Sequence, residues 1–379
     1  MVLNNRQLRK QFVERLKKSK NPKDCLVVDA GTNMFNTNPR CVLFKDDIKK
    51  VPNGAFANCF KLDLIVLSNS IKNIGQGAFA HHKCPFIYVP NSVNLIGQNA
   101  FYNKKMQAIR LPRHKHFEMF AKDFSYLDIF IYDNEIICTH SNETKQKDLL
   151  QEGCYKSDVY LECNQIDYYD LWNGLSTINS LHIGSHDTLI ATDVPFTPKI
   201  IDHIYMNNVG HSKLLFDGGC LVDLTSGKLL FVENRENIVL PSSITDLNSL
   251  PDCQKGKTIN YDISQNNHFI KRNDIIINSK GKALFVPNQT TVYFINCTSF
   301  ARNIFENKTK ITKIIIAPFE VEQIDLCSLF DALNNYCVNR FTIVFPTKLY
   351  GNTIVNEMFL SFGNKIVYKD YEESDYFLE

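Results

Sequence analysis

Short apolar triplets recur along residues 43–112 at a nearly constant spacing. The triplets at 42–44, 65–67, 87–89 and 109–111 have centres that step by 23, 22 and 22 residues. Each triplet alternates as a half-buried strand does, with two inward aliphatic side chains on either side of one outward position. A fixed period in the low twenties is typical of a solenoid, in which short coils stack on one another.

A second signal recurs in register with the triplets. Phe56, Phe79 and Phe101 each follow an alanine, which itself follows Gly or Asn. We predict that these rings fill the core and that the alanines fit where space is small. Gly75 and Gly97 precede two of the clusters, where the backbone must bend tightly or approach its neighbour. One coil of about 22 residues cannot bury its apolar side alone, so the stack of coils is the stable object.

The unit resembles the BspA-like leucine-rich repeat, whose pattern is roughly I-x-I-P-x-S-V-T-x-I-G-x-x-A-F-x-x-C. Residues 87–101 carry most of it, and Cys59 supplies the terminal cysteine of an earlier unit. His82 and Lys104 replace that cysteine in the next two units. The resemblance implies a β-rich (α/β) repeat solenoid, a right-handed leucine-rich-repeat solenoid with one concave parallel sheet and inserted β-hairpins.

Beyond residue 112 the repeat continues with less regularity. Ten further strand triplets are expected, at 129–131, 159–161, 181–183, 204–206, 238–240, 259–261, 292–294, 314–316, 343–345 and 366–368. Most steps between them equal one repeat, and four are longer by roughly ten residues. Residues 217–232 and 272–286 each read as an apolar strand, a Gly-containing turn and a second apolar strand, which predicts a hairpin. Residues 133–138 begin a third hairpin, and 321–336 have the spacing of a helix.

The N-terminal residues 5–19 predict a helix, because Leu8, Phe12 and Leu16 recur at helical spacing among basic side chains. We expect a cap that shields the open edge of the first coil, with a membrane-surface or partner-binding helix as the alternative. The expected division is a cap at 1–24, well-formed repeats at 25–130, and degenerate repeats at 131–379 that continue the first part.

Composition disfavours some classes of partner and location but does not identify a function. The net charge of +2 gives no electrostatic case for nucleic acid or a membrane surface as partner. The twelve cysteines show no C-x-x-C spacing, which favours small buried hydrophobes in a reducing compartment over a disulfide framework or a zinc site. Neither a signal peptide nor a transmembrane segment is recognisable, so we expect a cytoplasmic protein, with cell-surface association as the alternative.

No motif for catalysis stands out. Nucleotide-binding glycine loops, H-E-x-x-H and G-x-S-x-G are absent. We interpret His81 and His82 as solvated loop residues, and the spacing of His182 and His186 fixes no common direction for a metal. We therefore expect no enzyme activity, no catalytic residue, no cofactor and no metal.

What the resemblance does imply is a surface, because the middle residue of each strand triplet would face solvent on the concave sheet. The candidate partner-binding residues are Leu43, Val66, Tyr88, Arg110 and Phe130. The same position in later strands holds Tyr160, His182, Tyr205, Val239, Asn260, Tyr293, Ile315, Val344 and Val367. Exposed aromatic and apolar patches with an arginine commonly mark protein contacts. The alternative is that strands merely favour such residues, or that inserted elements cover the face.

The function expected from this surface is a non-enzymatic scaffold that binds a protein partner. The first alternative is a surface-associated adhesin exported without a classical signal peptide, since BspA-like proteins include adhesive members. The second is a hydrolase or transferase hidden in residues 131–260. The sequence leaves the identity of the partner and the oligomeric state open.

Overall fold

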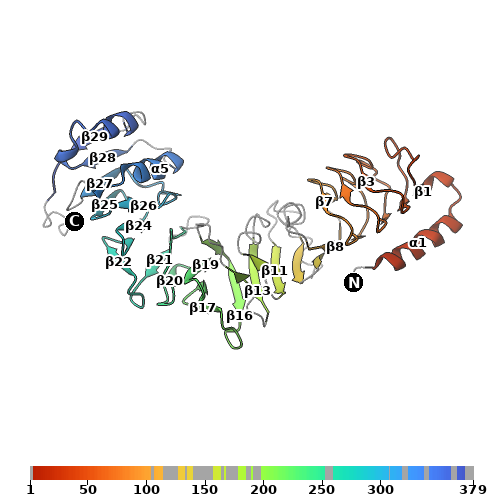
Figure 1. Ribbon diagram of the computed structural model, residues 1–379, viewed down its shortest axis with the longest axis horizontal. Helices are drawn as coiled ribbons and strands as arrows, with labels where there is room; N and C mark the ends of the chain where they lie inside the picture. The colour runs from red at the N-terminus through yellow and green to blue at the C-terminus, as the bar shows by residue number, and fades with distance from the viewer. Residues whose placement is uncertain are drawn as a thin grey trace. The chain divides into compact units, whose positions relative to one another are not determined.

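The structure is a computed structural model (Figure 1). It describes residues 3–103, 106–113, 127–132, 135–139, 157–163, 166–167, 178–184, 189–190, 198–251, 259–306, 308–317, 323–336, 341–359 and 365–371. The chain divides into two compact units. The first comprises residues 1–190 and 203–211, and the second comprises 191–202 and 212–379. The boundary expected near residue 130 therefore falls inside the first unit.

The first unit begins with helix α1 (Asn5–Lys18), whose N-terminus is closed by a capping box between Asn4 and Gln7. A short 3-10 turn, η1 (Pro22–Asp24), leads into the first strand. The first three coils supply the parallel strands β1 (Cys25–Val28), β2 (Cys41–Phe44) and β4 (Leu64–Val66). A second, smaller parallel sheet pairs β3 (Lys50–Val51), β5 (Asn73–Ile74) and β7 (Leu95–Ile96). Each coil of the regular stretch thus crosses two sheets.

The Ala-Phe clusters form the core of these coils, as the sequence predicts. Phe56 and Phe79 stack with their ring centres 5.6 Å apart, and Phe79 and Phe101 with theirs 5.5 Å apart. All three rings are fully buried. Because each ring contacts the equivalent ring of the next coil, the period of the sequence becomes a continuous column of aromatic side chains.

The glycines of the unit serve two different purposes. A Cβ on Gly75 would lie 2.4 Å from the backbone nitrogen of Asn53, so the neighbouring coil approaches too closely for any side chain. Gly77 instead has a positive φ of 60°, with open space around it. Asn99 takes the same position in the next coil with a φ of 55°. The need for a positive φ explains why either Gly or Asn precedes Ala-Phe.

The first unit continues as a seven-stranded sheet in the order β16-β13-β11-β9-β10-β8-β6. Its strands are β6 (Phe86–Tyr88), β8 (Ala108–Pro112), β9 (Asp128–Tyr132), β10 (Glu135–Thr139), β11 (Ser157–Glu162), β13 (Ile178–Ile183) and β16 (His203–Met206). Strand β10 is antiparallel to both β8 and β9. The short strands β12 (Ile166–Asp167) and β14 (Leu189–Ile190) pair separately.

The described residues of the second unit form four sheets. Its strands are β15 (Lys199–Ile201), β17 (Leu214–Asp217), β18 (Cys220–Asp223), β19 (Lys228–Glu233), β20 (Asn237–Val239), β21 (Asn260–Asp262), β22 (Phe269–Arg272), β23 (Ile275–Asn278), β24 (Lys282–Phe285), β25 (Thr291–Ile295), β26 (Ser299–Phe300), β27 (Lys313–Ala317), β28 (Thr342–Phe345) and β29 (Lys365–Tyr368). Helix α5 (Leu326–Tyr336) packs against β26, and two single turns, η4 (Thr347–Leu349) and η5 (Val355–Phe359), follow β28.

The positions of the elements agree well with the periodicity of the sequence. Each of the ten later triplets lies in or overlaps a strand, and 326–336 is helical. Strands β18–β19 and β23–β24 are the two predicted antiparallel hairpins, with Gly227 and Gly281 at positive φ in their turns. Strand β10 lies in the third segment expected to form a hairpin.

The expectation of one parallel sheet is not met. The described strands belong to several sheets, and antiparallel strands are inserted among the parallel ones in both units. Two of the positions expected to face solvent, Ile315 and Val344, are buried.

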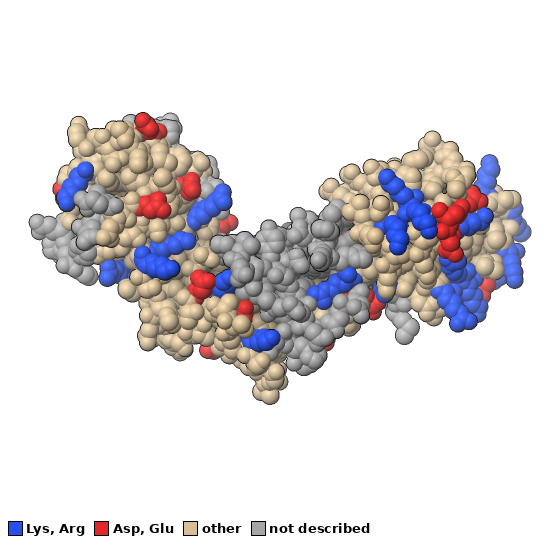
Figure 2. Space-filling model, viewed as in Figure 1, with Lys and Arg blue, Asp and Glu red and all other residues tan. Residues whose placement is uncertain are grey.

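The cysteines follow the sequence prediction more closely. Eight of the nine whose side chains the structure describes are buried with free thiols, and Cys327 is exposed. Lys, Arg, Asp and Glu are interspersed on the face shown in Figure 2, with basic side chains gathered where Figure 1 draws α1. Within the described residues, no helix is both long and apolar enough to span a membrane.

Candidate functional site

The candidate site is the outward face of the strands in the first unit. The strand registers place its predicted residues side by side: Leu43 pairs with Val66, and Tyr88 pairs with Arg110. Farther along the sheet, Phe130 pairs with Tyr160, Tyr160 with His182, and His182 with Tyr205. Within each run of parallel strands, these middle positions therefore lie in register, side by side.

Helix α1 covers the beginning of this face. Its buried Leu8 and Phe12 pack on Cys25, Cys41, Leu64 and Val66, and the half-buried Leu43 and Tyr88 border the same cluster. Val66 is fully buried, so the expectation that it faces solvent is wrong. The helix also differs from the expected cap, since it contacts the outward face of β1, β2 and β4.

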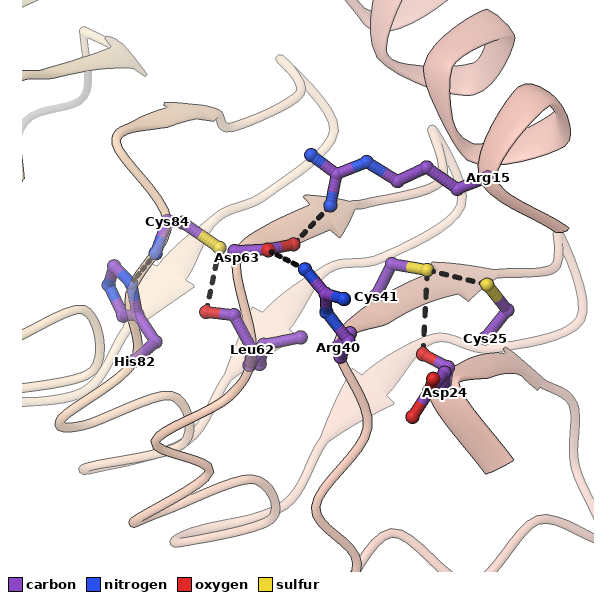
Figure 3. Close-up of polar contacts among 9 residues, drawn as sticks. All are labelled: Arg15, Asp24, Cys25, Arg40, Cys41, Leu62, Asp63, His82 and Cys84. Carbon is purple, nitrogen blue, oxygen red and sulfur yellow. Dashed lines mark hydrogen bonds and ion pairs between the residues drawn. The ribbon is translucent and has the colours of Figure 1, made fainter. Parts of the chain in front are cut away.

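Partly exposed ion pairs accompany the apolar packing of α1. Arg15 pairs with Asp63, which also pairs with Arg40, and Arg9 pairs with Asp46. Figure 3 shows Arg15 reaching from the helix to Asp63 on the loop before β4. The basic residues that suggested a membrane-binding helix thus include two, Arg9 and Arg15, that pair with acidic side chains of the chain's own coils.

Arg110 is held by four groups. Its guanidinium carbon lies 4.6 Å from the centre of the Tyr88 ring, and its Nε donates to Glu135 at 2.6 Å. One terminal nitrogen donates to the carbonyl of Val89 at 3.1 Å and to Asn91 Oδ1 at 2.9 Å. The side chain is only 13% exposed. Arg110 therefore ties β6, β8 and β10 together and offers little of its charge to a partner.

The inserted strand β10 changes the neighbours of Arg110 and Phe130. The two residues are not adjacent, because Ile137 of β10 pairs with both of them. The expectation of a continuous parallel ladder from Tyr88 to Phe130 is therefore wrong. The apolar run at 135–138 signalled an extra strand, but its place between β8 and β9 depends on pairing that the repeat period does not encode.

Beyond β10 the face carries a stack of four aromatic rings. The ring centres lie 4.4 Å apart between Phe130 and Tyr160, 4.3 Å between Tyr160 and His182, and 4.5 Å between His182 and Tyr205. The interplanar angles are 5°, 14° and 19°, so the rings are nearly parallel. Tyr205 ends the stack and is 51% exposed. We call Phe130, Tyr160, His182 and Tyr205 the aromatic ladder.

A polar network supports the ladder at one side of His182. Asp158 Oδ1 accepts hydrogen bonds from Ser180 Oγ at 2.8 Å and from Asn179 Nδ2 at 2.7 Å. Ser180 Oγ also lies 2.9 Å from His182 Nε2. Because the hydroxyl proton of Ser180 points to Asp158, His182 must donate in this contact and does not act as a base toward the serine. The network fixes the orientation of the His182 ring.

The other histidines of the sequence analysis are placed differently from one another. His81 is exposed as expected, but His82 is buried, which corrects its interpretation as a solvated loop residue. Burial lowers the pKa of His82 to about 4. His114, His116 and His186 lie outside the described residues. Among the residues that the structure describes, no three His, Cys, Asp or Glu side chains are grouped to hold a metal ion.

Comparison with known proteins bears on the repeat region. The family model described as "BspA type Leucine rich repeat region" matches residues 30–129 in six copies. A search of curated proteins finds no match. One solved structure, "The Crystal structure of Pneumococcal vaccine antigen PcpA", is 12% identical, with 92% of this chain and 83% of that chain covered at a TM-score of 0.32. A likeness of that size supports no argument about function. Residues 30–129, whose coils are described above, are therefore a BspA-type leucine-rich repeat region.

Proposed function

We propose that this chain is a non-enzymatic scaffold that binds a protein partner through the outward, concave face of its leucine-rich-repeat strands. Leucine-rich repeats are a family of interaction modules, and the match over residues 30–129 supports that general role. The accessible part of the proposed surface consists of the half-buried Tyr88 and, beyond β10, of Phe130 and the rest of the aromatic ladder, whereas the largely buried Arg110 holds β6, β8 and β10 together. Leu43 and Val66 support α1 at the start of the face and are not part of the contact.

The aromatic ladder is the observation that carries this proposal. Four stacked rings form a rigid apolar strip, and rigid aromatic side chains lose little conformational entropy when a partner covers them. Tyrosine combines a large apolar area with a polar tip, which suits the centre of a protein interface. Strand propensity alone explains Phe and Tyr at these positions, but it does not favour His182 in the middle of a strand.

Recovery of bound proteins on the immobilised full-length chain tests the proposal. The triple variant Tyr88→Ala/Arg110→Ala/Phe130→Ala removes three residues of the surface. A matched triple variant, Phe60→Ala/Leu95→Ala/Val209→Ala, removes three large, exposed apolar residues that lie outside these strand positions. We expect a partner that the wild-type chain and the matched variant recover equally and that the first variant loses. Equal recovery by all three chains contradicts the proposal, provided that circular dichroism shows all three to be folded.

A surface-associated adhesin is the second candidate. The BspA-type match favours it, because the family includes surface and adhesive members. Labelling of intact cells with a membrane-impermeant biotin reagent separates the two candidates. Labelled chain on intact cells supports the adhesin, and labelling only after lysis contradicts it.

A further inference from the structure

Two cysteines face each other under helix α1. Cys25 of β1 and Cys41 of β2 are direct partners in the parallel register, and their sulfur atoms lie 2.9 Å apart (Figure 3). That separation is about 0.9 Å longer than a disulfide bond. The thiols of Cys59, Cys84 and Cys220 are oriented instead toward backbone carbonyl groups. The pairing of Cys25 with Cys41 is therefore a distinct arrangement rather than a general consequence of thiol burial.

The pair lies at the wall of a cavity of about 280 Å³ between the end of α1 and the first two strands. Four basic side chains also line the cavity, Arg15, Lys18, Lys20 and Arg40, together with one acidic side chain, Asp24. Cys25 is 7% exposed and Cys41 is 1% exposed, so a small molecule in the cavity reaches Cys25 first. Arg15 and Arg40 both pair with Asp63, so Lys18 and Lys20 supply the excess of positive charge, which favours an anionic ligand.

Hydrogen bonding distinguishes the two thiols. The Cys41 thiol is directed toward Cys25 Sγ and toward the carbonyl oxygen of Asp24 at 3.5 Å. Burial, followed by the neighbouring Cys25, raises the pKa of Cys41 to about 12. Cys41 therefore keeps its proton, and its S–H is directed toward the sulfur of Cys25.

We propose that Cys25 and Cys41 are a reversible thiol–disulfide pair that a small anionic disulfide oxidises through the basic cavity. The Cys25 thiolate attacks one sulfur of the incoming disulfide, which breaks the S–S bond and expels one thiolate. Cys41 then loses its proton and attacks Cys25 Sγ, which expels the second thiolate and forms the Cys25–Cys41 bond. The pair gives up two electrons and two protons, and the small disulfide becomes two thiols.

The bond would join two strands that α1 already bridges. Cys25 and Cys41 are 16 residues apart, and both lie in the apolar cluster beneath Leu8 and Phe12. A link here closes a short loop and attaches the outermost strand of the first sheet covalently to its neighbour. Oxidation would therefore stabilise the surface on which the N-terminal helix rests.

Thiol counting and peptide mapping test the pairing. The reduced full-length chain is incubated with glutathione disulfide, denatured, alkylated and digested. We expect the number of free thiols to fall from twelve to ten, with one linked peptide joining Cys25 to Cys41. Twelve remaining thiols, a link between other cysteines, or glutathione retained on Cys25 beside a free Cys41 would each overturn the proposal.

Variants and salt test the route. Cys41→Ser should trap glutathione on Cys25, whereas Cys84→Ser should leave the linked peptide unchanged. At low salt, Lys18→Gln/Lys20→Gln should slow oxidation by glutathione disulfide about threefold or more. Added salt should slow oxidation by this anionic reagent and accelerate oxidation by the cationic disulfide cystamine. The same salt response for both reagents would contradict the role of the basic cavity.

Discussion

Arg110 in β8 and Glu135 in the inserted strand β10 form an ion pair of 2.6 Å that joins the regular repeats to the rest of the seven-stranded sheet. The arginine side chain is largely buried and the glutamate is one-third exposed. The pair is therefore intermediate between a buried and an exposed ion pair. Removal of one partner greatly destabilises a protein when the pair is buried and has little effect when the pair is exposed.

The first prediction concerns this pair. Glu135→Ala should lower the free energy of unfolding by about 1–2 kcal/mol, because Arg110 loses a charge-assisted hydrogen bond while it stays buried. Asp46→Ala, which removes the exposed 3.6 Å pair with Arg9, is the matched control and should change it by less than about 0.5 kcal/mol. Urea unfolding of the full chain measures both. Equal changes in the free energy of unfolding for the two variants would show that the ion pair between Arg110 and Glu135 does not stabilise the fold.

The second prediction separates the two kinds of glycine. Gly75→Ala should destabilise the chain by about 2 kcal/mol, because its Cβ would meet the backbone of Asn53 and the coils would have to move apart. Gly77→Asn should be close to neutral, since Asn99 takes the equivalent positive φ in the next coil. The urea unfolding midpoints of the two variants measure this difference. An equal loss of stability at both positions would contradict the two different roles of these glycines.

The third prediction is a pH dependence from His82. Its Nε2 donates to the carbonyl of Phe101 at 3.3 Å, and its Nδ1 accepts from the backbone of Cys84 at 2.9 Å. Protonation of Nδ1 would break the second bond and place a charge in the core. With a folded pKa of about 4 against an unfolded value of 6.5, the unfolded state binds the proton first as the pH falls. Neutral His82 therefore makes its full contribution to the free energy of unfolding above pH 6.5. About 3 kcal/mol of this free energy is lost as the pH falls toward 4.

His82→Cys tests this, because Cys59 occupies the corresponding position of the preceding coil. The variant should lack the part of the pH dependence that His82 causes between pH 6.5 and 4. Urea midpoints at pH 7.5 and pH 5 for both chains measure the difference. An unchanged difference between the two pH values in the variant would assign the acid sensitivity to other groups.

The sequence predicts what depends on period and on local pattern. The spacing of the triplets locates strands as far as β29, because each coil must return an apolar strand to the same core. The helical spacing of Leu8 and Phe12 likewise predicts α1 and its apolar side. The repeat also indicates that His82 is buried, because His82 aligns with the buried Cys59. Its polar side chain nevertheless suggested a loop position.

The sequence does not predict which surfaces meet. An apolar side on α1 is compatible with covering either the edge or the face of the sheet, and only the packed structure distinguishes them. The place of β10 depends on antiparallel pairing with β8 and β9. The aromatic ladder needs the register of four parallel strands, which the sequence suggests, and ring orientations, which it does not specify.

The dissociation constant of the recovered partner tests the central claim most directly. Titration calorimetry would compare the wild-type chain with Phe130→Ala and Tyr205→Ala, which shorten the ladder, and with Phe60→Ala, which removes a side chain that is 55% exposed elsewhere. We predict that each ladder variant binds about tenfold more weakly or worse, equivalent to about 1.4 kcal/mol, and that Phe60→Ala binds within about twofold of wild type. Unchanged affinity for both ladder variants, with the chains folded, would contradict binding through this face.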